Sequence, residues 1–467
     1  MLPNNSRKLS RRRFLNGALL VGASAGASAA LAGCAQPAAA PSAPAGAQPA
    51  AEATVAPAAT GAVNLRFITN HGAADEPLFV KVVDNFMAAN PDITIERLDI
   101  AGEEFYNSIN TQGAGGQLPD VWYTRTFDVP VYASKGWTIS LQPFVERDAA
   151  EVDVDDFWPA EVAQMKWKGE LWALPYDFSN IGIYYNKNWF DDKAVAYPAN
   201  DEWKWDELLQ LGLNFIEKDG DNFKTWALDL YTWDWVFMGI LFGWGGKVYS
   251  DDFKESLIDS AENLDALKWF VASRDQGLYP QAGAAPAGIG PFQGAIVPMA
   301  FQGSWATVQL RSEIADKFDF DCLAMPKSPS GEPCINAAGG AWGISRDSKD
   351  PEAAWKFMKY LASTEGTNIL ISEPLRSIPG RKSSALVWNE TAEKGGLPPK
   401  NVAVFSKQME GAHAAPYPPY WRDYSNAWGN IIVPTLNGSV DEDPAETLKA
   451  FNEELTRIIE QNQDSLG

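Results

Sequence analysis

The chain has 467 residues, 46% of them hydrophobic, and carries 38 basic against 60 acidic side chains, a net charge of -22. This length predicts about two to three domains of an ordinary globular protein, and the acidity argues against nucleic acid or anionic lipid as a partner. Three cysteines and two histidines are too few for a disulfide framework or a Cys/His metal cluster, so we expect no metal and no cofactor.

The first 33 residues predict an export signal rather than folded structure. Residues 10–15 (SRRRFL) resemble the twin-arginine export motif, and an apolar stretch from 18 to 31 follows it. That stretch is too short and too weakly apolar for a lasting transmembrane helix. Residues 31–34 (LAGC) match the lipobox of bacterial lipoproteins. We therefore expect a twin-arginine lipoprotein signal peptide over 1–33 and lipidation of Cys34, the alternative being a chance cysteine after an ordinary signal.

Residues 34–62 are predicted to be a lipidated cysteine followed by a tether. After Cys34 this stretch is almost entirely Ala, Pro, Gly, Gln, Ser and Thr, a composition that cannot form a core. A lipid chain would hold the protein on the outer side of the cell membrane, since each buried methylene contributes roughly 0.8 kcal/mol. The expected location is extracytoplasmic, with the lipid as the only contact with the membrane.

The globular body begins with alternating strands and helices. Residues 63–68 alternate as a strand, apolar residues recur at helical spacing over 78–86, and residues 93–98 form a second strand. A helix around 103–110 and a glycine-rich turn then lead to a third strand at 119–123. This order predicts an α/β unit with a mainly parallel sheet.

Ligands of such sheets bind beyond the carboxyl ends of the strands. Two of these ends are residues 69–71 and 123–125 in this chain. They make Asn70, His71, Tyr123 and Arg125 candidate ligand-binding residues. An arginine offers a planar fork of donors to hydroxyl or acidic groups, although pairing at a surface or between domains would explain it equally well.

Several short segments of the globular body form a further pattern. They are 86–93 (FMAANPDI), 118–121 (LPDV), 174–176 (LPY), 183–187 (IYYNK), 294–299 (GAIVPM), 303–305 (GSW), 339–345 (GGAWGIS) and 350–357 (DPEAAWKF). These segments resemble the family 1 extracellular solute-binding proteins, the maltose-binding-protein-like family, and they keep the family's order from residue 63 to the end of the chain.

This resemblance implies a two-lobed periplasmic-binding-protein fold, in which each lobe is a mainly parallel sheet flanked by helices. One lobe would hold 63–175 and 340–372, and the other 180–338 and 376–467, joined by hinge crossings. It also implies a function: a monomeric receptor that captures a small solute by hinge closure and presents it to the permease subunits of an ABC importer, without catalysis.

An excess of aromatic residues, including 19 Trp, favours a sugar as the solute. An indole can cover the apolar face of a sugar ring, while polar groups bind its hydroxyls. Any single Trp is more often a core residue than a ligand-binding one. For Trp305, Trp342 and Trp421, however, the corresponding positions in the family favour the cleft. With the strand-end residues above, the predicted ligand set is completed by Asp177, Trp233, Trp305, Gly340, Trp342, Arg376 and Trp421.

Other functions stay open at this point, including an adhesin or a sensor without a transport role. A lipid-anchored glycoside hydrolase would share the aromatic and acidic residues, but it would need two carboxyl groups at a fixed separation across the sugar. A binding protein for a non-sugar solute, such as a polyamine, would suit the acidity of the chain.

A disulfide between Cys322 and Cys334 is also expected. These are the only cysteines of the globular body, and export implies an oxidising destination. A turn over 329–333 separates Cys334 from the alternating stretch around Cys322, so the two could face each other across a hairpin. The alternative is two separate core residues.

Overall fold

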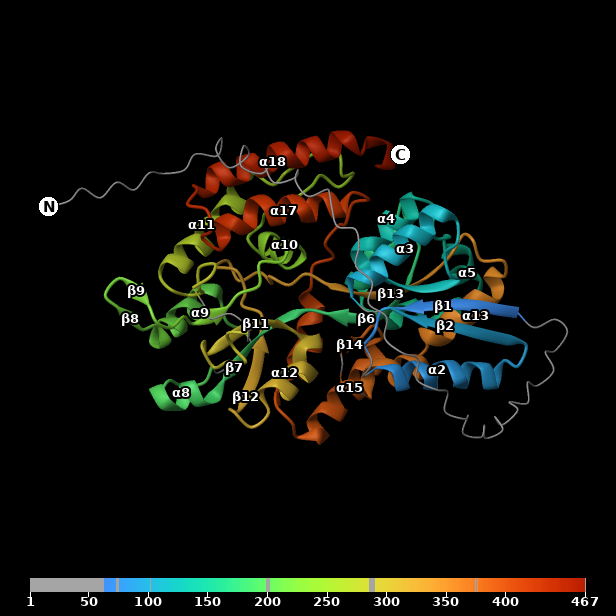
Figure 1. Cartoon of the computed structure of the whole chain (residues 1–467), viewed down its shortest axis with the longest axis horizontal. Coiled ribbons are helices and arrows are strands. Elements are labelled where there is room, and N and C mark those ends of the chain that lie inside the picture. The colour runs from blue at the N-terminus through green and yellow to red at the C-terminus, as the bar shows by residue number, and fades with distance from the viewer. Residues whose placement is uncertain are drawn as a thin grey trace, which may run out of the picture. The chain divides into compact units, whose positions relative to one another are not determined.

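Two mixed sheets organise the chain (Figure 1). The computed structural model describes residues 63–72, 75–100, 102–198, 202–284, 290–373, 375 and 377–466. We call the part built on the six-stranded sheet the first lobe and the part built on the four-stranded sheet the second lobe. Among the described residues, no helix is both long and apolar enough to cross a membrane. Cys34 and the tether lie outside the described residues.

The six-stranded sheet has the order β14-β6-β13-β3-β1-β2. Its strands are β1 (Val63–Thr69), β2 (Ile93–Asp99), β3 (Val121–Arg125), β6 (Leu174–Ser179), β13 (Ala338–Ile344) and β14 (Ile378–Pro379). β1 runs parallel to β2 and β3, as expected, but β13 is antiparallel to both β3 and β6, and β14 is antiparallel to β6. The expectation of a mainly parallel sheet therefore needs correction. β6 leads into the second lobe and β13 returns from it, so the two strands run in opposite directions.

The four-stranded sheet has the order β10-β11-β7-β12. Its strands are β7 (Ile181–Asn186), β10 (Leu228–Asp229), β11 (Met299–Gly303) and β12 (Phe320–Ala324). In this sheet only the β10–β11 pair is parallel. β7 lies between β11 and β12 and is antiparallel to both. Two small hairpins stand apart: β4 (Lys166–Trp167) with β5 (Glu170–Leu171), and β8 (Lys218–Asp219) with β9 (Asn222–Phe223).

The helices between β1 and β6 in the chain include the predicted amphipathic one. They are α2 (Glu76–Ala89), α3 (Glu103–Gly115), η1 (Thr126–Asp128), α4 (Val129–Ser134), α5 (Gln142–Arg147), α6 (Ala149–Val152), η2 (Val154–Asp156) and α7 (Pro159–Gln164). α2 buries Phe79, Val82, Val83 and Phe86, which confirms the helical spacing read from the sequence. These side chains belong to one hydrophobic cluster with the strands of the first lobe.

The helices between β7 and β14 are α8 (Lys187–Lys193), α9 (Trp205–Gly212), η3 (Leu213–Phe215), α10 (Asp234–Gly243), α11 (Ala261–Asp275), η4 (Ser304–Ala306), α12 (Thr307–Ile314), α13 (Pro351–Leu361), α14 (Thr364–Thr367) and η5 (Asn368–Ser372). α13 begins where the sequence predicts a helix start. The Asp350 side chain caps it by accepting from the Ala353 amide, and Pro351 occupies its first turn.

The chain ends in helices that follow β14. They are α15 (Lys382–Gly395), α16 (Ala403–Lys407), η6 (Gln408–Gly411), α17 (Trp421–Leu436), α18 (Pro444–Gln461) and α19 (Gln463–Leu466). α17 and α18 lie side by side and both contact α11 (Figure 1). α18 buries an apolar stripe that includes Leu448, Phe451 and Leu455. This helical layer completes the core of the second lobe.

The shortest crossing between the sheets is a single residue. Asn180 alone separates β6 from β7, and it is fully buried. Its amide Nδ2 donates to the Phe405 carbonyl at 2.8 Å, and its Oδ1 accepts from Gln408 Nε2 at 2.7 Å. A second crossing runs over 325–337 from β12 to β13. The chain was expected to belong to the other lobe from 376 onward, whereas β14 still pairs with β6 in the six-stranded sheet.

Candidate ligand-binding site

The first-lobe side of the candidate site is the end of the sheet where β1 and β3 finish in parallel. Asn70 follows β1, and its Nδ2 donates to the hydroxyl of Tyr106 on α3 at 3.0 Å. The guanidinium of Arg125, at the end of β3, lies over the Tyr106 ring, 3.6 Å from its centroid. Tyr106 thus brings together Asn70 and Arg125, two residues that the sequence nominated separately.

Arg125 is held by a buried carboxylate. Its Nε donates to Asp128 Oδ2 at 2.8 Å, and the Asp128 side chain is only 1% exposed. Burial works against the charge of Arg125, but Asp128 and the neighbouring Tyr106 outweigh it and raise its pKa. Arg125 Nη2 is buried and has no hydrogen-bond partner among the described residues. One donor of a fixed cation is therefore left for another group.

The second lobe contributes a group of aromatic side chains at the start of α10. Trp233 stacks on Tyr231, with ring centroids 4.6 Å apart and an interplanar angle of 9°. Its indole also stacks with Trp305, which follows β11, at 5.9 Å and 18°, and Trp235 lies 5.9 Å from Trp305. Trp233 is 41% exposed. We call Tyr231, Trp233, Trp235 and Trp305 the aromatic cluster.

A carboxylate lies between two of these indoles in the sequence. Asp234 opens α10, and its Oδ1 accepts from the Trp235 amide at 2.7 Å. Burial raises the pKa of Asp234, and the Ser425 hydroxyl and the Arg125 guanidinium both oppose that rise. Asp234 Oδ2 is buried without a hydrogen-bond partner among the described residues. Asp234 of the second lobe and Arg125 of the first lobe therefore each keep one buried polar atom without a hydrogen-bond partner among the described residues.

Aromatic residues also connect the lobes directly. Phe127 in η1 of the first lobe lies 5.8 Å from Trp421 and 5.7 Å from Tyr417 between ring centroids. Trp421, at the start of α17, is 3% exposed and also packs on Tyr424 at 4.9 Å. The structure therefore places Trp421 where the lobes meet but covers most of its surface with protein, so its contact with ligand stays a prediction.

Trp342 was predicted to bind ligand, but the structure places it in the core. It lies within β13, in the middle of the six-stranded sheet, and is 0% exposed. Its ring contacts Tyr176, Phe67 and Tyr123 at centroid distances of 4.5, 5.5 and 6.2 Å. A central strand of a covered sheet has no solvent-facing side, so Trp342 is a core residue of the first lobe and presents no face to a ligand.

Asp177, Gly340 and Tyr123 meet at the crossing strands. The Gly340 amide donates to Asp177 Oδ1 at 2.7 Å, and the Ser377 hydroxyl donates to Asp177 Oδ2 at 2.5 Å. A Cβ atom on Gly340 would come within 2.4 Å of the Tyr123 ring, so only glycine fits there. Both oxygens of Asp177 thus bind the first lobe itself, which gives this acid a structural role at the crossing.

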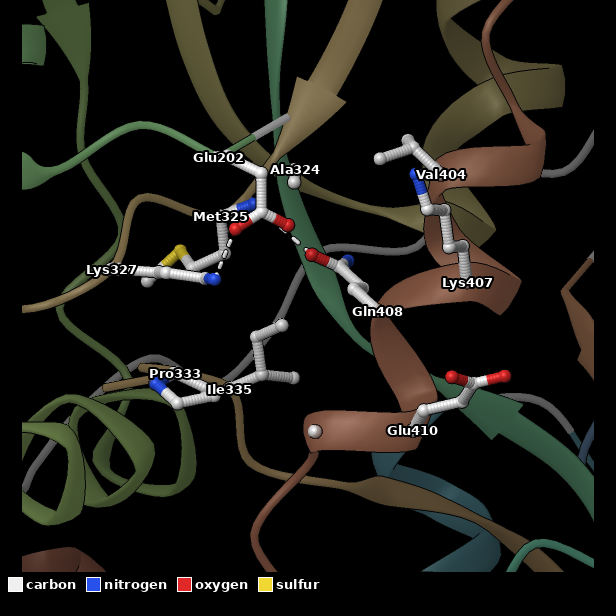
Figure 2. Close-up of a pocket in the computed structure, with 11 residues that line it drawn as sticks. Glu202, Ala324, Met325, Lys327, Pro333, Ile335, Val404, Lys407, Gln408 and Glu410 are labelled. Carbon is white, nitrogen blue, oxygen red and sulfur yellow. Dashed lines mark hydrogen bonds and ion pairs between the residues drawn. The ribbon is translucent and has the colours of Figure 1, made fainter. Parts of the chain in front are cut away.

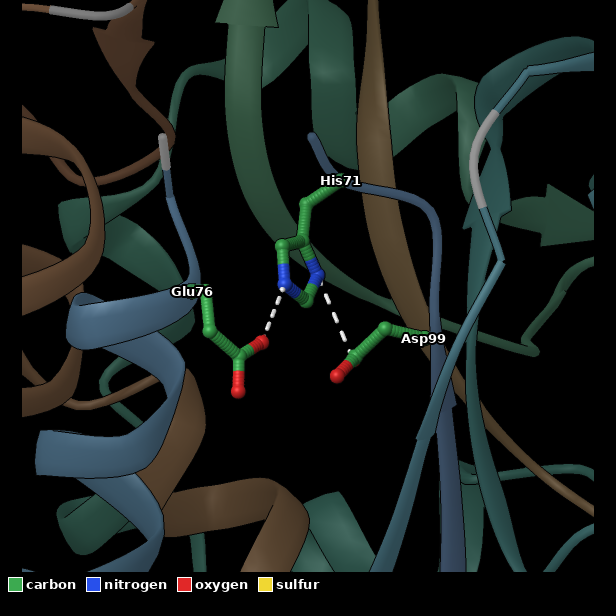
Figure 3. A group of neighbouring side chains, drawn as sticks. All are labelled: His71, Glu76 and Asp99. Atoms are coloured by element: carbon green, nitrogen blue, oxygen red, sulfur yellow. Dashed lines mark hydrogen bonds and ion pairs between the residues drawn. The ribbon is translucent and has the colours of Figure 1, made fainter. Parts of the chain in front are cut away.

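His71 is buried instead of lining a cleft (Figure 3). Its Nε2 lies 3.1 Å from Glu76 Oε2, and its Nδ1 lies 3.4 Å from Asp99 Oδ1. The ring stacks on Phe79 with centroids 4.1 Å apart. The imidazole therefore ties the segment after β1 to α2 and β2, and the prediction that it contacts ligand directly is not supported by this geometry.

His71, Glu76 and Asp99 bring possible metal ligands within 4.8 Å of one another. The two carboxylates approach different ring nitrogens of His71 in this arrangement. Arg97 also bonds to both carboxylates, at 2.8 Å to Glu76 and 2.6 Å to Asp99. Arg97 first and His71 second lower the pKa of Glu76 to about 2. Arg97, His71 and the two carboxylates thus form a network of ion pairs.

A cavity of about 210 Å³ opens elsewhere on the second lobe, beside the 325–337 crossing (Figure 2). Met325, Ile335 and Gln408 are among its lining residues, and Gln408 Oε1 accepts from the Met325 amide at 3.0 Å. Lys327 pairs with Glu202 at its rim. None of the residues predicted from the sequence to bind ligand lines this cavity.

The expected disulfide is also corrected. Cys322 lies in β12, where its Sγ is 3.3 Å from the Asn401 carbonyl oxygen, whereas Cys334 lies in the crossing segment and packs against α10 at Gly243. Both side chains are buried, in different hydrophobic clusters, and they are not bonded to each other. The turn between them does not close a hairpin, because β12 pairs with β7 and the chain after the turn crosses to the first lobe.

Arg376 lies outside the described residues, so the structure does not place it. The residues that sequence reasoning missed are Tyr106, Phe127, Asp128, Asp234 and Arg422. Asp234 carried a signal, since two tryptophans flank it in the sequence. Tyr106 carried none, because its role depends on α3 packing beside the end of β3.

The geometry can be compared with known proteins. The model of the bacterial extracellular solute-binding protein family matches residues 72–368, more than half of the chain. The erythritol/L-threitol-binding protein of Mycolicibacterium smegmatis is 22% identical over 309 residues, 60% of this chain and 63% of that protein, so the match spans less than two thirds of this relative. The maltodextrin-binding protein MdxE of Bacillus subtilis is 22% identical over 357 residues, 74% and 79% of the two chains.

A solved structure agrees with the fold. An ABC substrate-binding protein from Listeria monocytogenes, in complex with cycloalternan, superposes with a TM-score of 0.73 at 21% identity, covering 85% of this chain and 98% of that one. The two-lobed α/β fold expected from the sequence is thereby confirmed. On the family match, the chain belongs to the bacterial extracellular solute-binding proteins.

Proposed function

We propose that the protein is an extracytoplasmic receptor that captures a carbohydrate between its lobes and delivers it to an ABC importer. The observation that carries this proposal is the aromatic cluster of the second lobe, which includes the two sequence neighbours of Asp234. In the first lobe, Arg125 adds a buried guanidinium nitrogen that has no hydrogen-bond partner among the described residues. Indoles cover the apolar faces of sugar rings, while a carboxylate and a guanidinium accept from and donate to hydroxyl groups.

The charge of this region favours a neutral ligand. Two carboxylates, Asp128 and Asp234, are accompanied by two guanidiniums, Arg125 and Arg422. A polyamine would need an excess of acidic groups, and a sugar acid an excess of basic ones. The balance therefore supports a neutral polyhydroxyl compound. The relatives named above agree with this class: one is an erythritol/L-threitol-binding protein, one is a maltodextrin-binding protein, and one was solved in complex with cycloalternan.

The same charges argue against a glycoside hydrolase. Retaining and inverting enzymes need a pair of carboxyl groups across the scissile bond. Asp128 has both oxygens engaged by arginines, and one oxygen of Asp234 accepts from the Trp235 amide. A receptor role also fits the proposed lipid anchor at Cys34, which would keep the protein beside a permease in the membrane.

A panel of neutral mono- and oligosaccharides, polyols, a sugar acid and a polyamine, read by thermal shift, tests the ligand class. Bound ligand stabilises the folded state by about 2.7 kcal/mol at a hundredfold excess over Kd. We expect stabilisation by at least one neutral sugar or polyol and by neither charged compound. Stabilisation by the polyamine alone would overturn the carbohydrate assignment, and release of shortened products from an oligosaccharide would overturn the receptor assignment.

A further inference from the structure

The carboxylate of Asp128 is shared by guanidiniums from both lobes. Arg125, in the same lobe, donates to Oδ2 at 2.8 Å, and Arg422, at the start of α17 in the second lobe, donates from Nη2 to Oδ1 at 3.2 Å. The Asp128 side chain is 1% exposed, whereas that of Arg422 is 42% exposed. One oxygen of a buried acid thus receives its partner from across the interlobe boundary.

The surroundings hold this pair in place. The Arg422 guanidinium lies 5.3 Å from the centroid of the Tyr106 ring, over which Arg125 also lies. The residue before Arg422 is Trp421, which packs against Phe127, the residue before Asp128. An ion pair thus lies beside an aromatic contact between the same two segments, η1 and the start of α17. The Arg422 guanidinium is also attracted by the negative face of the Tyr106 ring.

Opening of the lobes would break both contacts at once. Asp128 would keep Arg125 but would exchange Arg422 for water, so the gain on closing is that of a partly buried ion pair. None of these groups has to bind a ligand to make the contact. The aromatic contact adds buried apolar area in the same step.

We propose that Asp128 and Arg422 form a latch that draws the lobes together before ligand arrives, and that Arg422 acts as a positioning residue for Arg125. The second role rests on the proposed ligand site. Arg422 binds one oxygen of the Asp128 carboxylate, and the other oxygen of that carboxylate orients the Arg125 guanidinium. A protein whose closed form is already populated binds ligand more tightly, since the apparent Kd falls as the competent fraction rises.

The latch can be tested without any ligand. Spin labels at Asp84→Cys on α2 and Lys268→Cys on α11 report the separation of the lobes by pulsed electron paramagnetic resonance, since both positions are exposed. The full chain carries Cys34→Ser, and Cys322 and Cys334 are buried. We expect a closed population in this background. Arg422→Gln should lower the ratio of closed to open molecules roughly fivefold, about 1 kcal/mol, and Arg422→Lys by less.

Arg457→Gln is the matched control, because it removes one arginine from an ion pair with Glu454 that lies within α18. It should leave the ratio unchanged, and circular dichroism checks that each variant folds. A background population that is entirely open, or the same ratio in Arg422→Gln, would overturn the latch. Since no sugar is added, failure of the sugar panel leaves this result intact.

The positioning role has its own readout once a ligand is known. Arg422→Gln should raise the dissociation rate constant while leaving the association rate constant within about twofold, because the pair forms after encounter. Arg422→Lys should restore part of the loss. Unchanged dissociation in Arg422→Gln, with a shifted closed population, would retain the latch and remove the positioning role.

Discussion

The indole of Trp305 lies directly over the backbone of Gly303. A Cβ atom at Gly303 would come within 2.2 Å of the six-membered part of that indole. Gly303 ends β11, so the absence of a side chain there lets the indole fold back toward Trp233, whose ring it meets at 5.9 Å. The position of the Trp305 indole, which is predicted to bind a sugar, is therefore set by a buried residue that has no side chain.

Gly303→Ala should displace the Trp305 indole and weaken binding of the identified ligand roughly tenfold, a loss typical of a disturbed anchor residue. Isothermal titration calorimetry measures the loss. Gly343→Ala in β13 serves as control, because a Cβ there meets only Thr138 at an ordinary 3.4 Å. Equal affinities for the two variants would show that Trp305 does not anchor the ligand.

Trp305→Ala should weaken ligand binding, whereas Trp342→Ala should destabilise the folded state. Trp305→Ala is expected to cost on the order of 2 kcal/mol of binding free energy. Trp342→Ala leaves a cavity in the first-lobe core and should cost about 3–5 kcal/mol of unfolding free energy. Urea denaturation and calorimetry separate the two effects. If Trp342→Ala were as stable as the parent protein, its assignment to the core would be wrong.

Asp229, at the end of β10, should make stability depend on pH. Burial raises its pKa to about 6, above the unfolded value near 3.9. The folded state then holds this proton more tightly, so the contribution of Asp229 is full below about pH 4 and is lost as pH rises through about 6. Asp229→Asn should remove that loss, worth up to about 3 kcal/mol at neutral pH. Urea unfolding at several pH values checks this.

The exposed Asp221, in the turn between β8 and β9, provides the control for that measurement. Asp221→Asn should give a pH profile parallel to that of the parent protein. Parallel profiles for Asp229→Asn as well would contradict the expected role of the buried carboxyl group.

Cys322 and Cys334 should both react with a thiol reagent once the protein is unfolded without reductant. Their membership of separate hydrophobic clusters is the physical reason. In the native state both should react slowly because both are buried, and burial also raises the pKa of the Cys334 thiol. Loss of both reactive groups in the unfolded, unreduced chain would instead indicate a disulfide.

Cys34 should be the first residue of the mature protein and should carry lipid, as the lipobox predicts. Mass spectrometry of the protein from its native membrane checks this. Arg11→Lys combined with Arg12→Lys should block export if the twin-arginine route is used. Unchanged export of this double variant would point to the general secretory route, and an unmodified N-terminus elsewhere would exclude lipidation.

Local patterns predicted the elements but not the burial of single tryptophans. The spacing of Phe79, Val82 and Phe86 was enough to place α2, because one face of an isolated helix already shows it. Trp305 and Trp342 each lie two residues after a glycine in the sequence, yet Trp305 follows the end of β11 and Trp342 lies inside β13. Which strand is central depends on pairings between segments more than a hundred residues apart.

The same limit applied to the charged residues. The order of the elements was enough to place Arg125 at the end of β3, because the carboxyl ends of parallel strands can be read from that order. Its partners could not be read in this way. Asp128 is close in sequence, but its second partner, Arg422, is 294 residues away and meets it only when both lobes have folded.

The single-residue crossing at Asn180 has a consequence for building reporters from this protein. Because β6 and β7 are separated only by a buried, hydrogen-bonded asparagine, an added linker there would uncouple the two sheets mechanically. The β8–β9 hairpin, by contrast, is a short pair with an exposed turn. A fluorescent protein inserted in that turn would move with the second lobe, and an acceptor dye on α2 would move with the first. Rotation of the lobes about Asn180 would then change the energy transfer between the two fluorophores.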